Sequence, residues 1–154
     1  MKKEYDFIFS LGSACLCSQM LRKKGLQTYS YPLDWVRGGD FSQRVDFLLS
    51  EFKDYFNKED FVFEEIQNTN KDNPCDVYIN LRTGMSFPHD FLQGNSFDEE
   101  FEKNKEKYNR RINRLLMNIN KNKDILIVYT VVPTENQEDT NAEILKSCYE
   151  RICN

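Results

Sequence analysis

The sequence lacks the long apolar runs that would mark a membrane or secreted protein. No stretch approaches the about 20 apolar residues needed to span a bilayer, and Met1-Lys2-Lys3-Glu4 precedes too short an apolar segment for a signal peptide. The chain has five cysteines, an odd number, and no secretion signal. The sequence therefore predicts a cytoplasmic location and free thiols rather than a disulfide framework.

Few residues are available to bind a metal or a cofactor. Cys15 and Cys17 are separated by one residue, His89 is the only histidine, and no second cysteine pair has zinc-finger spacing. No cofactor-binding motif is present, so we expect neither a metal nor a cofactor. Lys and Arg total 21 against 25 Asp and Glu, and the net charge of -4 argues against nucleic-acid and membrane partners.

The composition supports one globular domain over residues 1–154. Of the 154 residues, 40% are hydrophobic and 14% aromatic, and no repeat, linker or low-complexity segment divides the chain. The apolar spacing predicts strands at 5–9, 61–66, 77–81 and 124–132, a hairpin over 77–87, an extended segment at 27–35, and helices at 14–24, from 41, at 97–120 and after 140.

This order of elements is typical of a layered α/β fold. We predict a mixed, partly parallel sheet flanked by helices, with Rossmann-like layering, in which strands 5–9 and 125–131 are parallel neighbours. The unbroken apolar run at 124–132 indicates a central strand covered on both faces. Pro88 is expected to end its strand near a sheet edge. Capping boxes are predicted to begin three of the helices, at Asp40, Ser96 and Thr140.

The turn after the first strand carries the first candidate site residue. Ser13 is predicted to cap a helix over 14–24 that ends at Gly25, which places Cys15 in its first turn. The amide groups and dipole of a helix N-terminus stabilise a thiolate, so Cys15 is a candidate nucleophile. The alternative is a small residue buried under a tight turn. The inner face of this helix is predicted to carry Cys17, Met20 and Leu21.

Four ordered motifs resemble a known family. They are Ser10-Leu11-Gly12-Ser13-Ala14-Cys15, Tyr31-Pro32-Leu33-Asp34-Trp35, Phe87-Pro88-His89-Asp90-Phe91 and the paired-arginine helix at 108–114. Over residues 7–132 the chain resembles the bacterial domain family of unknown function labelled papain-like cysteine peptidases. It departs from that pattern at Leu33, where phenylalanine is usual. It is also short at its C-terminus, where a last strand or a third catalytic partner would be missing.

The resemblance implies a cysteine-dependent hydrolase, either a peptidase or a related acyl hydrolase or transferase. Its Cys-His dyad maps onto Cys15 and His89, where the imidazole would take the thiol proton and later protonate the leaving group. Asp34 is the first candidate to orient that imidazole, and the adjacent Asp90 is a poorer one. A papain-like α+β fold is the implied alternative architecture. The expected partner is a small-molecule, peptide or glycan-linked substrate.

The residue types alone also allow non-catalytic, structural roles for His89 and Asp34. A lone histidine such as His89 is often a hydrogen-bonded structural residue, and Asp34 could cap a turn. A purely structural or interaction role for the whole domain follows if both interpretations hold.

A second functional hypothesis is a non-catalytic α/β domain that binds an anion, a nucleotide or a glycan-linked group. The helix N-terminus at Gly12 and Ser13 would contribute amide groups. Arg110 and Arg111 would each neighbour Arg114 on a helix surface, so the three could add a fork of guanidinium groups for a phosphate or carboxylate. The alternative for the arginines is a solvated face paired to Glu106 or Asp98.

Overall fold

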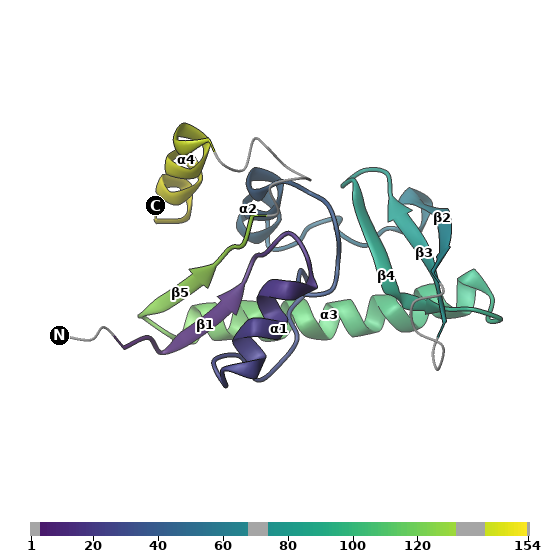
Figure 1. The fold of residues 1–154 in the computed structure, drawn as a ribbon, viewed down its shortest axis with the longest axis horizontal. Coiled ribbons are helices and arrows are strands. Elements are labelled where there is room, and N and C mark those ends of the chain that lie inside the picture. The colour runs from purple at the N-terminus through teal and green to yellow at the C-terminus, as the bar shows by residue number, and fades with distance from the viewer. Residues whose placement is uncertain (1–3, 68–73, 132–140, 154) are drawn as a thin grey trace.

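The computed structural model describes residues 4–67, 74–131 and 141–153, with the elements labelled in Figure 1. In chain order these are β1 (Phe7–Ser10), α1 (Cys15–Lys23), α2 (Phe41–Leu49), a 3-10 turn at Lys58–Asp60, β2 (Phe61–Gln67), β3 (Cys75–Asn80), β4 (Met85–Leu92), α3 (Phe97–Lys121), β5 (Ile125–Val128) and α4 (Ala142–Cys153).

The strands form two separate sheets rather than one mixed sheet. β1 pairs in parallel with β5, from Phe7 opposite Ile125 to Ser10 opposite Val128, which confirms the predicted parallel neighbours. β2, β3 and β4 form an antiparallel sheet in that order, which confirms the hairpin. Figure 1 shows α3 running beneath both sheets, with α1 in front of it. The fold is therefore α/β, with a parallel and an antiparallel sheet flanked by four helices.

α3 connects the two sheets through its apolar side. Its 25 residues correspond to a rod of about 38 Å, and Ser96 caps it by accepting a hydrogen bond from the amide of Glu99. Phe101 and Tyr108 face the antiparallel sheet, where stacked and edge-on rings fill the core; their ring partners are Phe56, Phe61 and Phe87. Phe61 in turn contacts Phe91. Leu115 is buried farther along the helix.

The prediction of a central strand at 124–132 is wrong for the part that the structure describes. β5 pairs with β1 alone there, and every residue of Ile125–Val128 is only partly buried. Ile125, Ile127 and Tyr129 pack against the core cluster, while Leu126 and Val128 are not part of that contact. The apolar run therefore reflects one packed face. Residue 132, the last of the predicted strand, lies outside the described residues.

Pro88 does not end its strand, contrary to the prediction. Asp76 on β3 pairs with Phe91, and Tyr78 pairs with Phe87, so residues 88–90 of β4 bulge opposite the single residue Val77. β4 is at the edge of its sheet, as predicted. Proline lacks an N–H for the ladder, and an edge bulge is one of the few positions in a sheet where it is tolerated.

The ends of helices α1 and α4 show which predicted caps form, and one of them is corrected. The N-cap of α1 is Ala14, without a side-chain cap, because the Ser13 hydroxyl donates to the Thr130 carbonyl instead, at 3.1 Å. Gly25, with φ of +69°, ends α1 as predicted. The predicted cap Thr140 lies outside the described residues, and the side chain of Asn141 accepts the Glu143 amide of α4, at 2.9 Å.

Two predicted surfaces are also corrected. Met20 is 55% exposed, while Cys17 and Leu21 are buried, so the inner face of α1 lies on the 17 and 21 side. Residues 32–35 form a turn, in which the Asp34 amide donates to the Tyr31 carbonyl at 3.3 Å, rather than a fully extended segment. The capping box at Asp40 and Gln43 is present at the start of α2, as predicted.

Candidate functional site

Arg44 on α2 holds together the two segments that carry the first two motifs. Its side chain is fully buried, and its guanidinium donates to the carbonyl oxygens of Gly12 and, at 3.2 Å, of Ser13. It also donates to the carbonyls of Leu33, at 3.4 Å, and Gly38, at 2.6 Å. Charge-assisted hydrogen bonds of this kind are stronger than neutral ones. Arg44 therefore fixes the turn before α1 against the segment at 33–38.

Sequence reasoning missed Arg44, although the sequence contains a signal for it. Arg44 is three residues after Phe41 and four before Leu48, so it shares the apolar face of α2. A charged residue on the apolar face of a helix indicates a buried, hydrogen-bonded group.

The turn before α1 is packed closely around Gly12 and Ser13. A Cβ atom at Gly12 would lie 2.4 Å from Cβ of Cys17, so only glycine fits there. The Gly12 amide donates to the Ser10 hydroxyl at 3.0 Å, and the Ser13 side chain is fully buried against Thr130. Both predicted anion-binding residues are thus engaged in holding the turn.

Cys15 is the first residue of α1 and is half-buried. Cys17 faces the opposite way, into the protein, where its thiol lies 3.5 Å from the Val128 carbonyl. Residues four apart on a helix are neighbours on its surface, about 5–6 Å between Cβ atoms, so Cys15 shares a face with Gln19. Gln19 in turn lines a surface pocket.

This pocket, hereafter the basic pocket, has a volume of about 380 Å³ and lies where α1, the segment at 30–35, β4 and α3 meet. Its lining residues are Gln19, Ser30, Trp35, His89, Asp90, Lys107 and Arg111. Residues from three of the four sequence motifs therefore line one pocket, and Cys15 of the remaining motif lies one helical turn from it.

His89 is an exposed residue of the β4 bulge. Its ring meets Trp35 edge-on, with centroids 6.2 Å apart and an interplanar angle of 85°. Partial burial lowers the pKa of His89 below its usual value, and Asp90 raises it less than Arg37 and burial together lower it. The imidazole is therefore mostly neutral near pH 7 and able to accept a proton. Among the described residues no hydrogen bond joins His89 to Cys15.

Asp34 is fully buried and is not among the residues that line the basic pocket. Its Oδ2 accepts from Nε2 of Gln27 at 2.6 Å and from the Tyr31 amide at 2.8 Å, and its carbonyl accepts from the Ser18 hydroxyl of α1 at 3.2 Å. Burial raises the pKa of Asp34 to about 6, against these hydrogen bonds. Its Oδ1 is buried without a partner in the described part of the chain. The carboxyl group thus orders its own loop, and its hydrogen bonds do not include His89.

Asp90 follows His89 on the bulge and points into the protein. Its carboxylate accepts from Nζ of Lys107 at 2.5 Å and from the Tyr108 hydroxyl at 2.8 Å. Its carbonyl accepts from the Asn104 side chain at 2.6 Å. Three residues of α3 therefore fix the bulge that carries His89.

The three arginines of α3 do not form one fork. Arg111 lines the basic pocket, and its guanidinium lies 5.2 Å from the centroid of the Tyr108 ring. Arg114 donates to the Ser30 carbonyl at 3.2 Å and covers the Tyr29 ring at 4.7 Å. Arg110 is exposed. In the described ranges none of them forms a salt bridge with Glu106 or Asp98, and Asp98 pairs with Lys58 at 3.1 Å.

The wall formed by Ser30 and Trp35 is also held by a cation. Nη2 of Arg22 donates to the Ser30 hydroxyl at 2.7 Å, and the indole Nε1 of Trp35 donates to the same oxygen at 3.0 Å. The Arg22 guanidinium lies 5.7 Å from the centroid of the Trp35 ring. These contacts fix the side of the basic pocket that faces His89.

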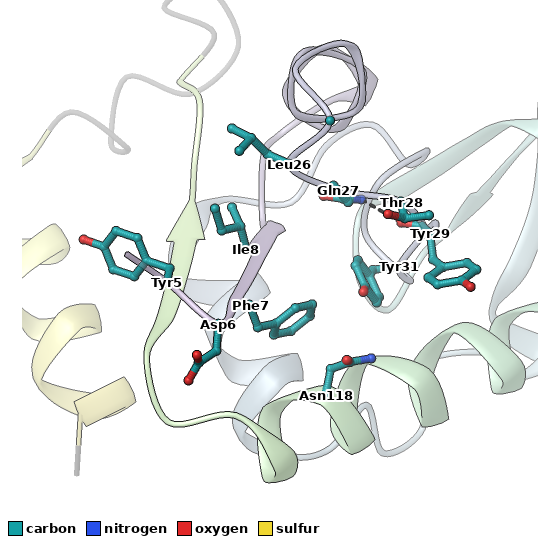
Figure 2. Close-up of a pocket in the computed structure, with 11 residues that line it drawn as sticks. Tyr5, Asp6, Phe7, Ile8, Leu26, Gln27, Thr28, Tyr29, Tyr31 and Asn118 are labelled. Carbon is teal, nitrogen blue, oxygen red and sulfur yellow. Dashed lines mark hydrogen bonds between the residues drawn. The ribbon is translucent and has the colours of Figure 1, made fainter. Parts of the chain in front are cut away.

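A second pocket, of about 390 Å³, lies between β1 and the segment at 25–31. Figure 2 shows Leu26 and Ile8 on one side of it, and Phe7, Tyr31 and Asn118 on the other. Asp6 is the one charged residue that lines it, and its lining includes no cysteine or histidine. Of these two pockets, the basic pocket is the one whose described lining contains a histidine.

Two features are absent from the described residues. No group of three or more His, Cys, Asp or Glu side chains is placed to hold a metal ion. No helix in the described ranges has the length and apolar character needed to cross a membrane.

The fold and the site define an α/β domain with a cysteine at a helix N-terminus, one turn from a pocket that contains a histidine. The chain belongs to the family described as "Putative papain-like cysteine peptidase (DUF1796)", whose model matches residues 6–153. The comparisons with curated proteins and with solved structures found no match.

Proposed function

We propose that this protein is a cysteine-dependent hydrolase in which Cys15 is the nucleophile and His89 the general base. The observation that supports this most directly is the position of Gln19, which shares a face of α1 with Cys15 and lines the pocket that contains His89. The family description agrees with a cysteine peptidase. Catalytic hydrogen bonds are often absent from ligand-free structures, so a bound substrate is expected to close the distance between the two side chains.

The proposed reaction is acyl transfer to Cys15 followed by hydrolysis. His89 removes the thiol proton, and the thiolate attacks the carbonyl carbon of the substrate. The tetrahedral intermediate collapses to a thioester as the leaving group departs with the proton from His89. A water molecule, deprotonated by His89, then attacks the thioester, and Cys15 recovers its proton as the carboxylic acid product leaves.

The two aspartates have different roles in this proposal. Asp90 is the positioning residue for His89, since α3 fixes it and its charge favours the protonated imidazole that forms during the reaction. Asp34 is proposed to act at a greater distance, by holding the loop that carries Trp35 against α1 through Ser18. Its effect on His89 would then pass through the Trp35 ring.

Alkylation of Cys15 by iodoacetamide, followed by peptide mass spectrometry, tests the dyad. Cys153 is exposed and outside the site, so it supplies an internal reference thiol in the same sample. We expect Cys15 to react about tenfold faster than Cys153 at pH 7, and His89→Ala to remove that advantage without changing the rate at Cys153. Cys15→Ser and His89→Ala should each abolish turnover of any acyl substrate found.

Two results would overturn the proposal. One is a Cys15 that reacts no faster than Cys153 across the pH range. The other is a fast Cys15 whose rate is the same in His89→Ala and in the native protein. Far-ultraviolet circular dichroism of each variant separates these results from a loss of fold.

A further inference from the structure

The basic pocket is surrounded by positively charged side chains, although the chain as a whole has a net negative charge. The chain has a net charge of -4, yet Lys107 and Arg111 line the pocket, and Arg22 and Arg114 bind Ser30 in its wall. Asp90 pairs with Lys107 at 2.5 Å. In the part of the chain that the structure describes, no carboxylate lies within 4.0 Å of the other three cations. The pocket therefore carries an excess of positive charge.

These cations differ in how many of their hydrogen-bond donors already contact groups of the protein. Arg22 and Arg114 each donate a hydrogen bond to Ser30, and each also covers an aromatic ring. Arg111 is stacked on Tyr108, which restrains its guanidinium, but it donates no hydrogen bond to a described residue. Its Nη1 atom is buried and lacks a partner there. Arg111 is thus a restrained guanidinium with donors left for a ligand.

The shape and the other lining groups fit a small anion. A guanidinium presents parallel donors that match a carboxylate or a phosphate. Gln19 is a further polar lining residue from α1, and Nζ of Lys107 adds a second charge that is shared with Asp90. A volume of about 380 Å³ accommodates such a group with part of the molecule that bears it.

We propose that the basic pocket binds an anionic group, a carboxylate or a phosphate, of the substrate, with Arg111 as its principal ligand. This inference rests on the proposed function, because it assigns the substrate class of the same site. The anion would lie about one helical turn from Cys15. It would hold the substrate with its acyl carbon at the thiol, so the preferred substrates would be acidic acyl compounds or peptides with an acidic side chain or terminus.

Fluorescence gives a direct measure of binding without turnover. Trp35 is the only tryptophan of the chain and lines the pocket. Titration with inorganic phosphate and, separately, with succinate should give a saturable change in its emission, while neutral succinamide should give none. Saturation by phosphate alone or by succinate alone supports the proposal and identifies the anion. Saturation by neither, or an equal response to succinamide, overturns it.

A pair of variants separates contact from general charge. Arg111→Gln and Arg110→Gln remove the same charge from adjacent positions, but only Arg111 lines the pocket. We expect Arg111→Gln to weaken binding about tenfold or more and Arg110→Gln to leave it within about twofold. Equal weakening in both variants overturns the assignment. If Arg111→Gln does not fold, Arg111→Lys keeps the charge, loses the fork and should still weaken binding.

The two proposals fail in different experiments. Anion binding that depends on Arg111, together with a Cys15 that alkylates like Cys153, would leave the anion site standing and remove the hydrolase. A Cys15 activated by His89, with no saturable response of Trp35 to either anion, would leave the hydrolase standing and remove the anion site.

Discussion

The guanidinium of Arg44 donates a hydrogen bond to the carbonyl oxygen of Gly12, and so ties α2 to the turn that begins the cysteine helix. The same group reaches the carbonyls of Leu33 and Gly38. One buried side chain thereby positions Cys15 relative to the loop that carries Trp35.

Replacing Arg44 should therefore be costly. Arg44→Met keeps much of the apolar stem but leaves several buried carbonyl oxygens without a donor, and we expect a loss of about 3 kcal/mol or more in the free energy of unfolding. Urea denaturation measures it. Arg110→Met is the matched control, since Arg110 is exposed, and it should change stability by no more than about 0.5 kcal/mol. Similar values for the two variants would show that Arg44 is not a structural centre.

Gly12→Ala tests the close packing of the turn. The new methyl group would lie 2.4 Å from Cβ of Cys17, and α1 would have to move away, at a cost of about 1–3 kcal/mol. The movement displaces Cys15, so its alkylation rate should change as well.

Gly25→Ala is the comparison for that variant. A Cβ at Gly25 meets no atom within 4 Å, but the φ of +69° strains an alanine, at a cost of about 1 kcal/mol. Because Gly25 is at the far end of α1, this variant should lose stability without altering Cys15 reactivity. A Gly12→Ala protein with native stability and native Cys15 reactivity would contradict the packing argument.

Asp34 should make stability depend on pH in a direction unusual for an aspartate. Burial raises its pKa from 3.8 to about 6, so the folded protein binds the proton more tightly than the unfolded chain. The contribution of Asp34 to the free energy of unfolding is greatest below about pH 4. It falls as the pH rises to about 6, by about 3 kcal/mol for the whole pKa shift. Above that range its contribution is constant.

Asp34→Asn isolates the effect of this ionisation. The amide oxygen can accept the hydrogen bonds that Oδ2 now accepts from Gln27 and Tyr31, and the NH₂ group replaces Oδ1, which has no described partner. The stability of the variant relative to the native protein should be greater at pH 7.5 than at pH 4.5, as measured by urea denaturation at both values. A difference that does not vary with pH would exclude a raised pKa.

Local features of this protein were readable from the sequence, and distant contacts were not. Gly25 and the Asp40–Gln43 box depend on bonds within a few residues, and the structure contains both. Ser13 failed as a cap because its hydroxyl finds Thr130, 117 positions away. Such a competitor cannot be seen in the spacing of residues.

The same distinction applies to the site. Residues 35, 89 and 111 belong to three of the four motifs and line one pocket, whereas the candidates Cys15 and Asp34 are not among its lining residues. The sequence did not predict that Arg114 would bind Ser30 while Arg111 stays available, because both occupy similar positions on α3. Nor did periodicity predict the bulge at Pro88, which depends on pairing with β3.

The last prediction concerns the proton on His89, which the proposed chemistry needs to be absent at rest. Its pKa is lowered by burial, raised by Asp90 and lowered by Arg37. His89 is the only histidine, so its imidazole signals in an NMR titration are unambiguous. We expect a midpoint below about 6.5 in the native protein.

The midpoint of the His89 titration should move up in Trp35→Ala, which removes the ring that packs against the imidazole, and down in Asp90→Asn, which removes the favourable charge. Arg37→Gln should move it up by a smaller amount. A midpoint that ignores Trp35 would mean that burial is not its cause, and one above 7 would leave His89 protonated and unable to act as the base for Cys15.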